Sequence, residues 1–262
     1  MRTLLICHDG AHLSQYGLSR WLASFSNLVG IIVLKERKHR VYKRIRREIG
    51  RVGITRFIDV VTFRIYYKFF LSKKDRIWEQ EKLQELNFTY PKIHDDIPIL
   101  KTHSPNSKDS EAFIKEVNPD IMIARCKTLL KKSIFSLPSK GTFVMHPGIS
   151  PEYRNAHGCF WALANNDLTN VGMTLLKIDQ GVDTGPVYGY YTYDFDEINE
   201  SHIVIQHREV LENLQELKKK LISIYNGDAI PLETTGRKSH TWGQPWLTAY
   251  IKLKFNARRR HK

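Results

Sequence analysis

The chain has 262 residues, of which 42% are hydrophobic, and this content argues for a protein with a buried core and against a disordered one. The formal net charge of +14 favours anionic partners such as nucleic acid, a membrane surface or phosphorylated metabolites. Three cysteines are too few for a disulfide framework, and no apolar run is long enough for a signal peptide or a membrane span. We therefore expect a cytoplasmic protein without a transmembrane segment.

The first elements in chain order predict the start of a parallel α/β sheet. The apolar run at 3–7 and the β-branched run at 28–34 have the composition of buried strands. Residues 13–25, which lie between them, are predicted to form a helix. Strand, helix and strand in this order are typical of a parallel α/β unit.

The composition changes between residues 35 and 56, where ten Lys or Arg accompany only two Glu. Apolar residues recur there at helical spacing, which predicts a basic amphipathic helix, at Val41, Ile45, Ile49 and Val52. A second helical period follows at Ile54, Phe57, Ile58, Val61, Ile65 and Phe69. Two interpretations stay open. The helices either pack on the body of the domain, or form a surface that docks nucleic acid or a membrane.

From residue 97 the α/β pattern resumes. Further strands are predicted at 97–102, 119–124, 141–147, 171–179 and 185–195. Helices are predicted at 75–87, 107–118, 131–138, 158–167 and 201–225, with Ser107 as an N-cap and the last as one long helix. Residues 226–262 are predicted to be a short, irregular, basic tail.

Polar segments follow three of the predicted strands. His146 lies at the end of one strand, Asp179 and Asp183 lie in the turn after another, and the segment 125–130 follows a third. Because ligands bind beyond the carboxyl ends of strands in open α/β sheets, we expect the three segments to meet at one edge. A His paired with an Asp is a general acid–base unit, although a lone histidine after a strand is more often a structural turn residue.

Two motifs at this spacing are "NPDIMIARCKTLLKKSIFSLPSKGTFVMHPGISPEYRNAHGCFWAL" and "LLKIDQGVDTGPVYG". With them, residues 118–189 resemble the folate-dependent formyltransferases, a family that includes methionyl-tRNA, glycinamide ribonucleotide and sugar-amine N-formyltransferases. The resemblance implies a Rossmann-like, three-layer α/β domain with a mostly parallel mixed sheet over 1–225. A basic helical insertion would interrupt this domain at about 36–90.

The resemblance also implies a reaction, in which 10-formyltetrahydrofolate donates a formyl group to an amine. His146 and Asp183 match the acid–base pair of the motifs, and four residues match positions near the folate, namely Lys127, Leu129, Leu130 and Val182. The acceptor would be a small, anionic amine such as an amino sugar, with Arg154 as a ligand for its phosphate or carboxylate. The alternatives are an RNA-borne amine, and a catalytically weakened relative that binds an anionic partner through its basic helices.

One position departs from the family motif. The family has an Asn two residues before the motif His, and this chain has Val144, which cannot donate a hydrogen bond. Loss of one oxyanion donor typically costs about 10²–10³ in rate. We expect Asn155 or His157 to supply the missing donor. No His and Cys cluster has metal-ligand spacing, so we expect no metal site.

Overall fold

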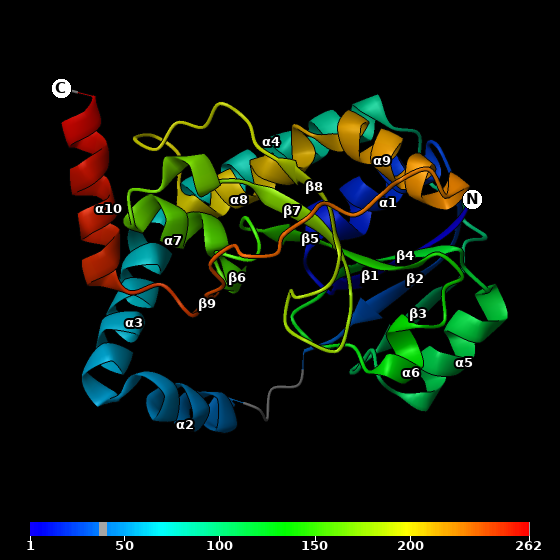
Figure 1. Ribbon diagram of the computed structural model, residues 1–262, viewed down its shortest axis with the longest axis horizontal. Helices are drawn as coiled ribbons and strands as arrows, with labels where there is room; N and C mark the ends of the chain where they lie inside the picture. The colour runs from blue at the N-terminus through cyan, green and yellow to red at the C-terminus, as the bar shows by residue number, and fades with distance from the viewer. Residues whose placement is uncertain (37–40, 262) are drawn as a thin grey trace.

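The computed structural model describes residues 1–36 and 41–261. A seven-stranded sheet with the strand order β3-β2-β1-β4-β5-β7-β8 forms its centre (Figure 1). The strands are β1 (Arg2–His8), β2 (Asn27–Leu34), β3 (Ile99–Thr102), β4 (Ile121–Arg125), β5 (Gly141–Pro147), β7 (Met173–Lys177) and β8 (Val187–Tyr191). The first five of these run parallel, whereas β7 and β8 are antiparallel to their neighbours. This mostly parallel, mixed sheet confirms the predicted fold class.

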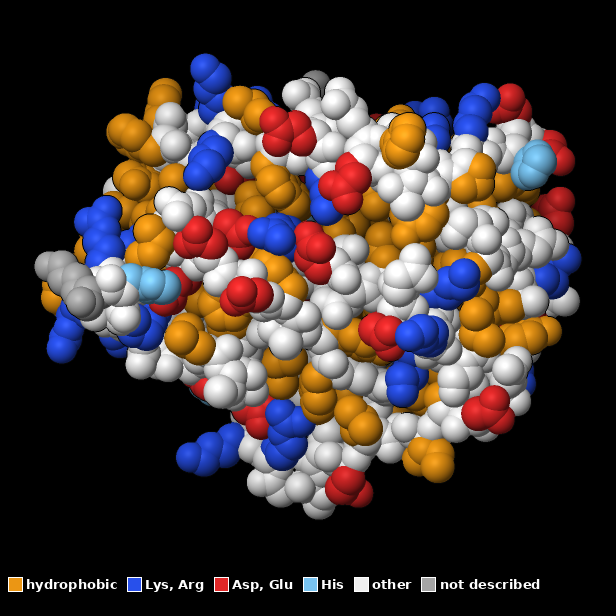
Figure 2. Space-filling model, turned by 90° about the horizontal axis from the view of Figure 1, so that it is seen from above, with side chains coloured by type: hydrophobic (Ala, Val, Ile, Leu, Met, Phe, Trp, Pro, Cys, Tyr) orange, Lys and Arg blue, Asp and Glu red, His pale blue; other side chains and the backbone are white. Residues whose placement is uncertain are grey.

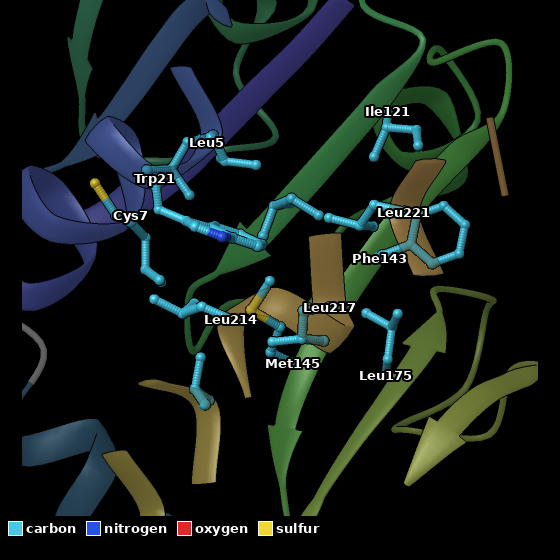
Figure 3. Close-up of a cluster of buried hydrophobic side chains, with 14 of the residues drawn as sticks. Leu5, Cys7, Trp21, Ile121, Phe143, Met145, Leu175, Leu214, Leu217 and Leu221 are labelled. Atoms are coloured by element: carbon cyan, nitrogen blue, oxygen red, sulfur yellow. The ribbon is translucent and has the colours of Figure 1, made fainter. Parts of the chain in front are cut away.

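Helices cover both faces of the sheet, as the alternation of side chains along each strand requires. One face packs on η1 (Leu13–Leu18), α1 (Ser19–Ala23), α4 (Ser72–Thr89), α8 (His202–Leu211) and α9 (Leu214–Asn226). Figure 3 shows side chains of this layer, where Phe143 and Met145 from β5 lie near Leu217 and Leu221 of α9. The other face packs on α5 (Lys108–Val117) and α6 (Lys132–Phe135). Ser107 caps α5 as predicted, because its side chain accepts a hydrogen bond from the Ser110 N–H.

The insertion is helical over the part that the structure describes. It contains α2 (Val41–Val52), α3 (Ile54–Tyr66) and the π-helical turn η3 (Tyr67–Leu71), and it leads into α4. The predicted basic helix at 35–56 includes residues 37–40, which lie outside the described residues. Within the described ranges, no helix is long and apolar enough to cross a membrane.

The packing face of α3 differs from the one that its periodicity predicted. The predicted stripe is largely exposed, since Ile54, Ile58 and Ile65 keep more than half of their accessible surface. The helix is instead anchored by Val60 and Phe63, which are buried on its opposite side. An apolar period locates the apolar side of a helix, but both sides of α3 are apolar. The side that is buried is the one that packs against the neighbouring α7 (Gly158–Ala164) and α10 (Leu247–Arg260).

The single long helix predicted at 201–225 is two helices in the structure. The break lies between α8 and α9, where Asn213 has non-helical backbone angles. Its side-chain amide donates to the carbonyl oxygens of Thr192 and Glu209. An Asn side chain that bonds to the backbone competes with the helical pattern, which explains why a continuous apolar period does not give a continuous helix.

The tail at 226–262 is not irregular throughout, so this prediction was wrong. It forms β9 (Thr241–Trp242), which pairs with β6 (Arg154–Asn155), and then α10. Four buried side chains hold α10 on the body, namely Ala249, Tyr250, Leu253 and Ala257. Two of the four are small alanines among many basic residues, so the periodic signal of this helix is weak.

Between α7 and β7 the chain also forms the 3-10 turn η4 (Leu168–Asn170).

Candidate active site

His146 lies on β5 in a buried position, with only 3% of its surface exposed. Its Nε2 is 2.7 Å from the carbonyl oxygen of Tyr153, and its Nδ1 is 3.5 Å from Oδ2 of Asp183. A carbonyl oxygen only accepts hydrogen bonds, so this contact places a proton on Nε2. Nδ1, which faces the carboxylate, is therefore the ring atom that is able to gain or lose a proton.

Two glycines allow the loop after β5 to fold tightly around His146. A Cβ atom on Gly148 would lie 2.6 Å from the Tyr153 oxygen and 2.8 Å from Cα of Gly158. Both distances are too short for any residue with a side chain. The glycines therefore let the backbone come close enough for the Tyr153 carbonyl to hold the imidazole ring.

Asp183 reaches His146 by a route that differs from the expected one. We expected the strands at 119–124, 141–147 and 171–179 to end at one edge, but β7 is antiparallel to β5, and Lys177 at its end lies beside Phe143. The loop after β7 must therefore run back toward the end of β5. Asp179 stabilises this loop by accepting hydrogen bonds from the Gly181 N–H and the Thr184 hydroxyl.

A second set of contacts fixes the carboxylate of Asp183. Its Oδ2 accepts a hydrogen bond of 2.8 Å from the backbone N–H of Asn155, and Arg154 Nη1 donates to the carbonyl of Val182. Asp183 has a φ of 51° and Asn155 a φ of 78°, a backbone region that Asp and Asn tolerate better than most residues. The structure thus brings together four of the predicted site residues, His146, Asp183, Asn155 and Arg154.

The tail supplies much of the support for this loop. The β6–β9 pairing joins Arg154 to Thr241, and the side chain of Asn155 donates to the carbonyl of Trp242 at 2.5 Å. Arg237 forms a two-point ion pair with Glu152, with distances of 2.9 and 2.7 Å. Sequence reasoning missed Arg237, Thr241 and Trp242, because they lie far along the chain from the motifs and in a segment with no recognised pattern.

His157 lies immediately before α7 and is half-buried, and its buried Nδ1 has no hydrogen-bond partner among the described residues. Burial lowers its pKa to about 4, and the positive charges of Lys127 and Arg64 act in the same direction. The histidine is therefore neutral at pH 7. Arg64 comes from α3, and its Nη2 donates to Gln244 of the tail, so the insertion and the tail both reach this side of the site.

The segment that was expected to bind the folate lies after β4, and polar contacts from two other segments hold it. The backbone N–H of Lys127 donates to Nε2 of His8, and the carbonyl of Leu129 accepts from the side chain of Asn106. The side chain of Leu129 is 62% exposed, whereas that of Leu130 is buried in the core near α5 and α6. Leu130 is thus placed to contact a ligand only through its backbone.

Val144 is on the same face of β5 as His146, because alternate residues of a strand point the same way. It stands opposite Leu176 of β7. The position is therefore directed toward the site, but the side chain brings no hydrogen-bond donor. Among the described residues no group of His, Cys, Asp and Glu is arranged to hold a metal ion.

Comparison with known proteins gives a consistent result. Residues 69–209 match the protein family described as formyl transferase. Methionyl-tRNA formyltransferase of Kosmotoga olearia is 37% identical over 92 residues, which are 35% of this chain and 29% of that protein. The enzyme of the same name from Thermotoga maritima is 28% identical over 140 residues, 51% of this chain and 44% of that one. The chain thus spans less than half the length of these relatives.

Solved structures share the fold over nearly the whole chain. A sugar N-formyltransferase from Shewanella superposes with a TM-score of 0.55 and 12% identity, and the match covers 97% of this chain and 86% of that one. Phosphoribosylglycinamide formyltransferase from Anaplasma phagocytophilum gives a TM-score of 0.54 and 11% identity, with 92% and 96% covered. At such low identity the likeness concerns the fold alone.

Proposed function

Because the chain belongs to the formyl transferase family, as its motifs predicted, we propose that it transfers a formyl group from 10-formyltetrahydrofolate to the amine of a small, anionic acceptor. The observation that carries this proposal is the buried contact between Nδ1 of His146 and the carboxylate of Asp183 at 3.5 Å. Such a pair is suited to moving protons between two nitrogen atoms near neutral pH.

The two residues have different tasks in this proposal. The attacking amine must lose a proton and the leaving folate nitrogen must gain one. His146 exchanges a proton at Nδ1, because Nε2 is held by the Tyr153 carbonyl. Asp183 is fixed by the Asn155 N–H, orients the imidazole and stabilises its charged form.

The carbonyl oxygen of the formyl group also needs a hydrogen-bond donor as charge develops on it. Val144 cannot provide one, and the Nδ2 of Asn155 already donates to Trp242. His157 has an unpartnered Nδ1 among the described residues and is neutral at pH 7, with a pKa of about 4. We assign the donor role to His157 on these grounds, ahead of Asn155.

The residues after β4 fit a folate ring. Asn106 and His8 hold this segment in place, which preorganises its backbone for hydrogen bonds to a pterin. The exposed side chain of Leu129 and the half-buried Val182 offer apolar contacts, and Leu130 contributes its backbone. Lys127 adds a positive charge that suits the carboxylates of a folate tail.

We infer an anionic acceptor from the cations near Asp183 and His157. The Nε of Arg154 is buried and has no hydrogen-bond partner among the described residues, although its Nη1 is engaged with Val182. The charges of Lys127 and Arg64 reach His157. A phosphate or carboxylate on the acceptor would satisfy the open donor of Arg154.

An RNA-borne amine is the second candidate acceptor. The basic sequence at 35–56 favours it, as do the relatives that carry the name methionyl-tRNA formyltransferase. An acceptor screen that includes both amino sugars and charged tRNA separates the two. A folate-binding chain that formylates neither would point to the weakened relative, in which the basic helices bind an anionic partner.

The proposal is tested in two stages on the full chain. Calorimetry with 5-formyltetrahydrofolate, a stable analogue of the donor, measures folate binding, and absence of binding would overturn the proposal.

For the acceptor that the screen identifies, we expect His146→Ala to lower kcat by about 10²–10⁴. Asp183→Asn is the second variant and tests the carboxylate that faces His146. Asn is chosen because it tolerates the positive φ of this residue. The exposed His94→Ala is the control and should leave kcat unchanged. Equal rates in all three variants would show that the pair is not catalytic.

A further inference from the structure

Helix α3 and the turn η3 expose an unusual amount of apolar surface. Ile54, Ile58 and Ile65 are 67%, 59% and 53% exposed. With 100° of rotation per residue they fall within about 40° of one another on the helix, so they form one stripe. The turn η3 extends the apolar surface with Phe69 and Phe70, which are 72% and 70% exposed. A contiguous exposed apolar patch, unlike a single exposed side chain, marks a surface that meets a partner.

The opposite side of α3 is the side that attaches the helix to the body. Phe63 is buried there and packs against the rings of Phe160 and Tyr250, at centroid distances of 5.8 and 5.2 Å. The helix is therefore attached to the body by one apolar side and presents the other to solvent. A helix that is apolar on both sides has a second surface available for something else.

Helix α10 lies beside α3 at the same end of the molecule (Figure 1). It is joined to α3 by the carboxylate of Asp59, which accepts from the backbone N–H and the hydroxyl of Thr248. It also leaves Ile251 and Phe255 exposed, at 57% and 60%. Figure 2 shows hydrophobic and basic side chains lying together at the left end of the molecule.

The charge on these elements has almost one sign. The segments 54–71 and 247–260 contain eight Lys or Arg and a single acid, Asp59, whose carboxylate already bonds to Thr248. Four of the basic side chains are exposed and form no ion pair with any described residue, namely Lys68, Lys252, Arg258 and Arg259. We call the exposed apolar and basic side chains of α3, η3 and α10 the α3–α10 surface.

We propose that the α3–α10 surface docks on an anionic membrane surface, with its isoleucines and phenylalanines in the headgroup region and its lysines and arginines on the lipid phosphates. Apolar side chains flanked by Lys and Arg are the composition of helices that lie in a membrane interface. An anionic leaflet attracts such cations, and the attraction holds the apolar groups at the depth where they lose contact with water.

Two other occupants fit the surface less well. A second copy of the chain would bring two strongly basic faces together, and like charges would oppose that association. RNA would bind the cations and stack on the phenylalanines, but it would leave Ile54, Ile58 and Ile65 in water. An anionic bilayer satisfies both the charged and the aliphatic side chains.

The test is cosedimentation of the full chain with vesicles of phosphatidylcholine alone and with vesicles that also contain phosphatidylglycerol. We expect binding to the second kind, reduced by salt, and little binding to the first. The double variant Ile58→Ser with Phe69→Ser should lower the partition coefficient at least about tenfold, because both lost side chains are exposed and apolar. Phe88→Ser is the matched control, since Phe88 is 95% exposed on α4 and outside the surface.

Every outcome bears on the proposal. Loss of binding in the double variant, with Phe88→Ser unchanged and both proteins equally stable to heat, supports it. Absence of binding by the unaltered chain overturns it, and so does equal binding by the double variant. Light scattering that shows a dimer, dissociated by the same double variant, would assign the surface to a second copy. Binding to RNA but not to vesicles would assign the cations to nucleic acid.

Discussion

The loop around His146 and the helix α3 differ in where they place polar and apolar side chains. In the loop, polar groups are paired, as in the buried contact of His146 with Tyr153 and the more open contact of Asp183 with Asn155. On the outer side of α3, aliphatic groups such as Ile58 are exposed to solvent. Burying a polar group and exposing an apolar one both cost free energy of folding. This cost is the physical reason to look for a function in both regions.

The difference also shows what kind of sequence pattern carries information. The loop is encoded by residue identities at fixed spacing, such as the histidine, the glycines and the acidic turn, and each identity meets one local requirement. The helix is encoded only by an apolar period, which many sequences share. A period predicts that a helix forms, but it does not say which of two apolar sides faces the core.

The strongest way to test this contrast is to truncate the two sides of α3 separately. Phe63→Ala should lower the free energy of unfolding by about 3–5 kcal/mol, because it opens a cavity among Phe160, Tyr250 and the ring of His202. Ile58→Ala should change it by less than about 0.5 kcal/mol, because its side chain is 59% exposed. Urea denaturation of the three proteins gives both values. Similar losses in the two variants would mean that the outer stripe is also packed.

The parts of the fold that the sequence predicts are those set by local composition. The buried strands are uninterrupted apolar runs, and the cap of α5 is a Ser in the expected place. The parts that it does not predict depend on partners far along the chain. The direction of β7, the break at Asn213 and the packing of α10 each arise from contacts with segments that no local pattern names.

The candidate site divides in the same way. The motifs name His146 and Asp183, and the structure brings them within 3.5 Å. The motifs do not name Arg237 or Gln244 of the tail, or Arg64 of α3, although these residues hold the loop or face His157. Their contacts come from a salt bridge and side-chain hydrogen bonds across long sequence distances, which leave no periodic trace.

The second prediction concerns the donor that replaces the motif Asn. His157→Gly should lower kcat for formyl transfer by about 10²–10³ if His157 bonds the oxyanion. Glycine is chosen because His157 has a φ of 55°, which glycine adopts without strain. Adding Val144→Asn to that variant should restore part of the rate, because residue 144 is on the same face of β5 as His146.

The rescue separates a chemical role from a structural one, since an Asn at 144 cannot repair a packing defect at 157. Asn155→Gly is the comparison variant, because it keeps the backbone N–H that bonds to Asp183 and removes the side chain that bonds to Trp242. A loss of kcat in this variant as large as that in His157→Gly would assign the donor role to Asn155 instead. The exposed His94→Ala is the control and should leave kcat unchanged. A faster Val144→Asn single variant combined with an unaffected His157→Gly would exclude His157 as the donor.

The smallest expected effect concerns a buried carboxyl group on α8, a helix that contacts α7. Glu209 of α8 is fully buried, and neither of its oxygens has a hydrogen-bond partner among the described residues. Burial raises its pKa to about 8, and the charge of Glu200 adds to the increase. On the outer side of α3 apolar groups are exposed, whereas here the interior holds an acid in its neutral form. The free-energy cost of burying this acid depends on pH.

This cost has a defined direction. The unfolded chain loses the proton of Glu209 near the ordinary pKa of a glutamate side chain, 4.5, whereas the folded chain keeps it until about pH 8, so stability decreases as the pH rises between these values. The half-buried His157 and His207, with pKa values of about 4, act in the opposite direction, but only below pH 6.5. Between pH 6.5 and 8 the effect of Glu209 is therefore isolated from theirs. Glu209→Gln should gain up to about 1.4 kcal/mol relative to the unaltered chain for each pH unit in that window. Urea denaturation at several pH values measures the gap, and parallel stability curves for the two proteins would show that the carboxyl group is ionised in the folded chain.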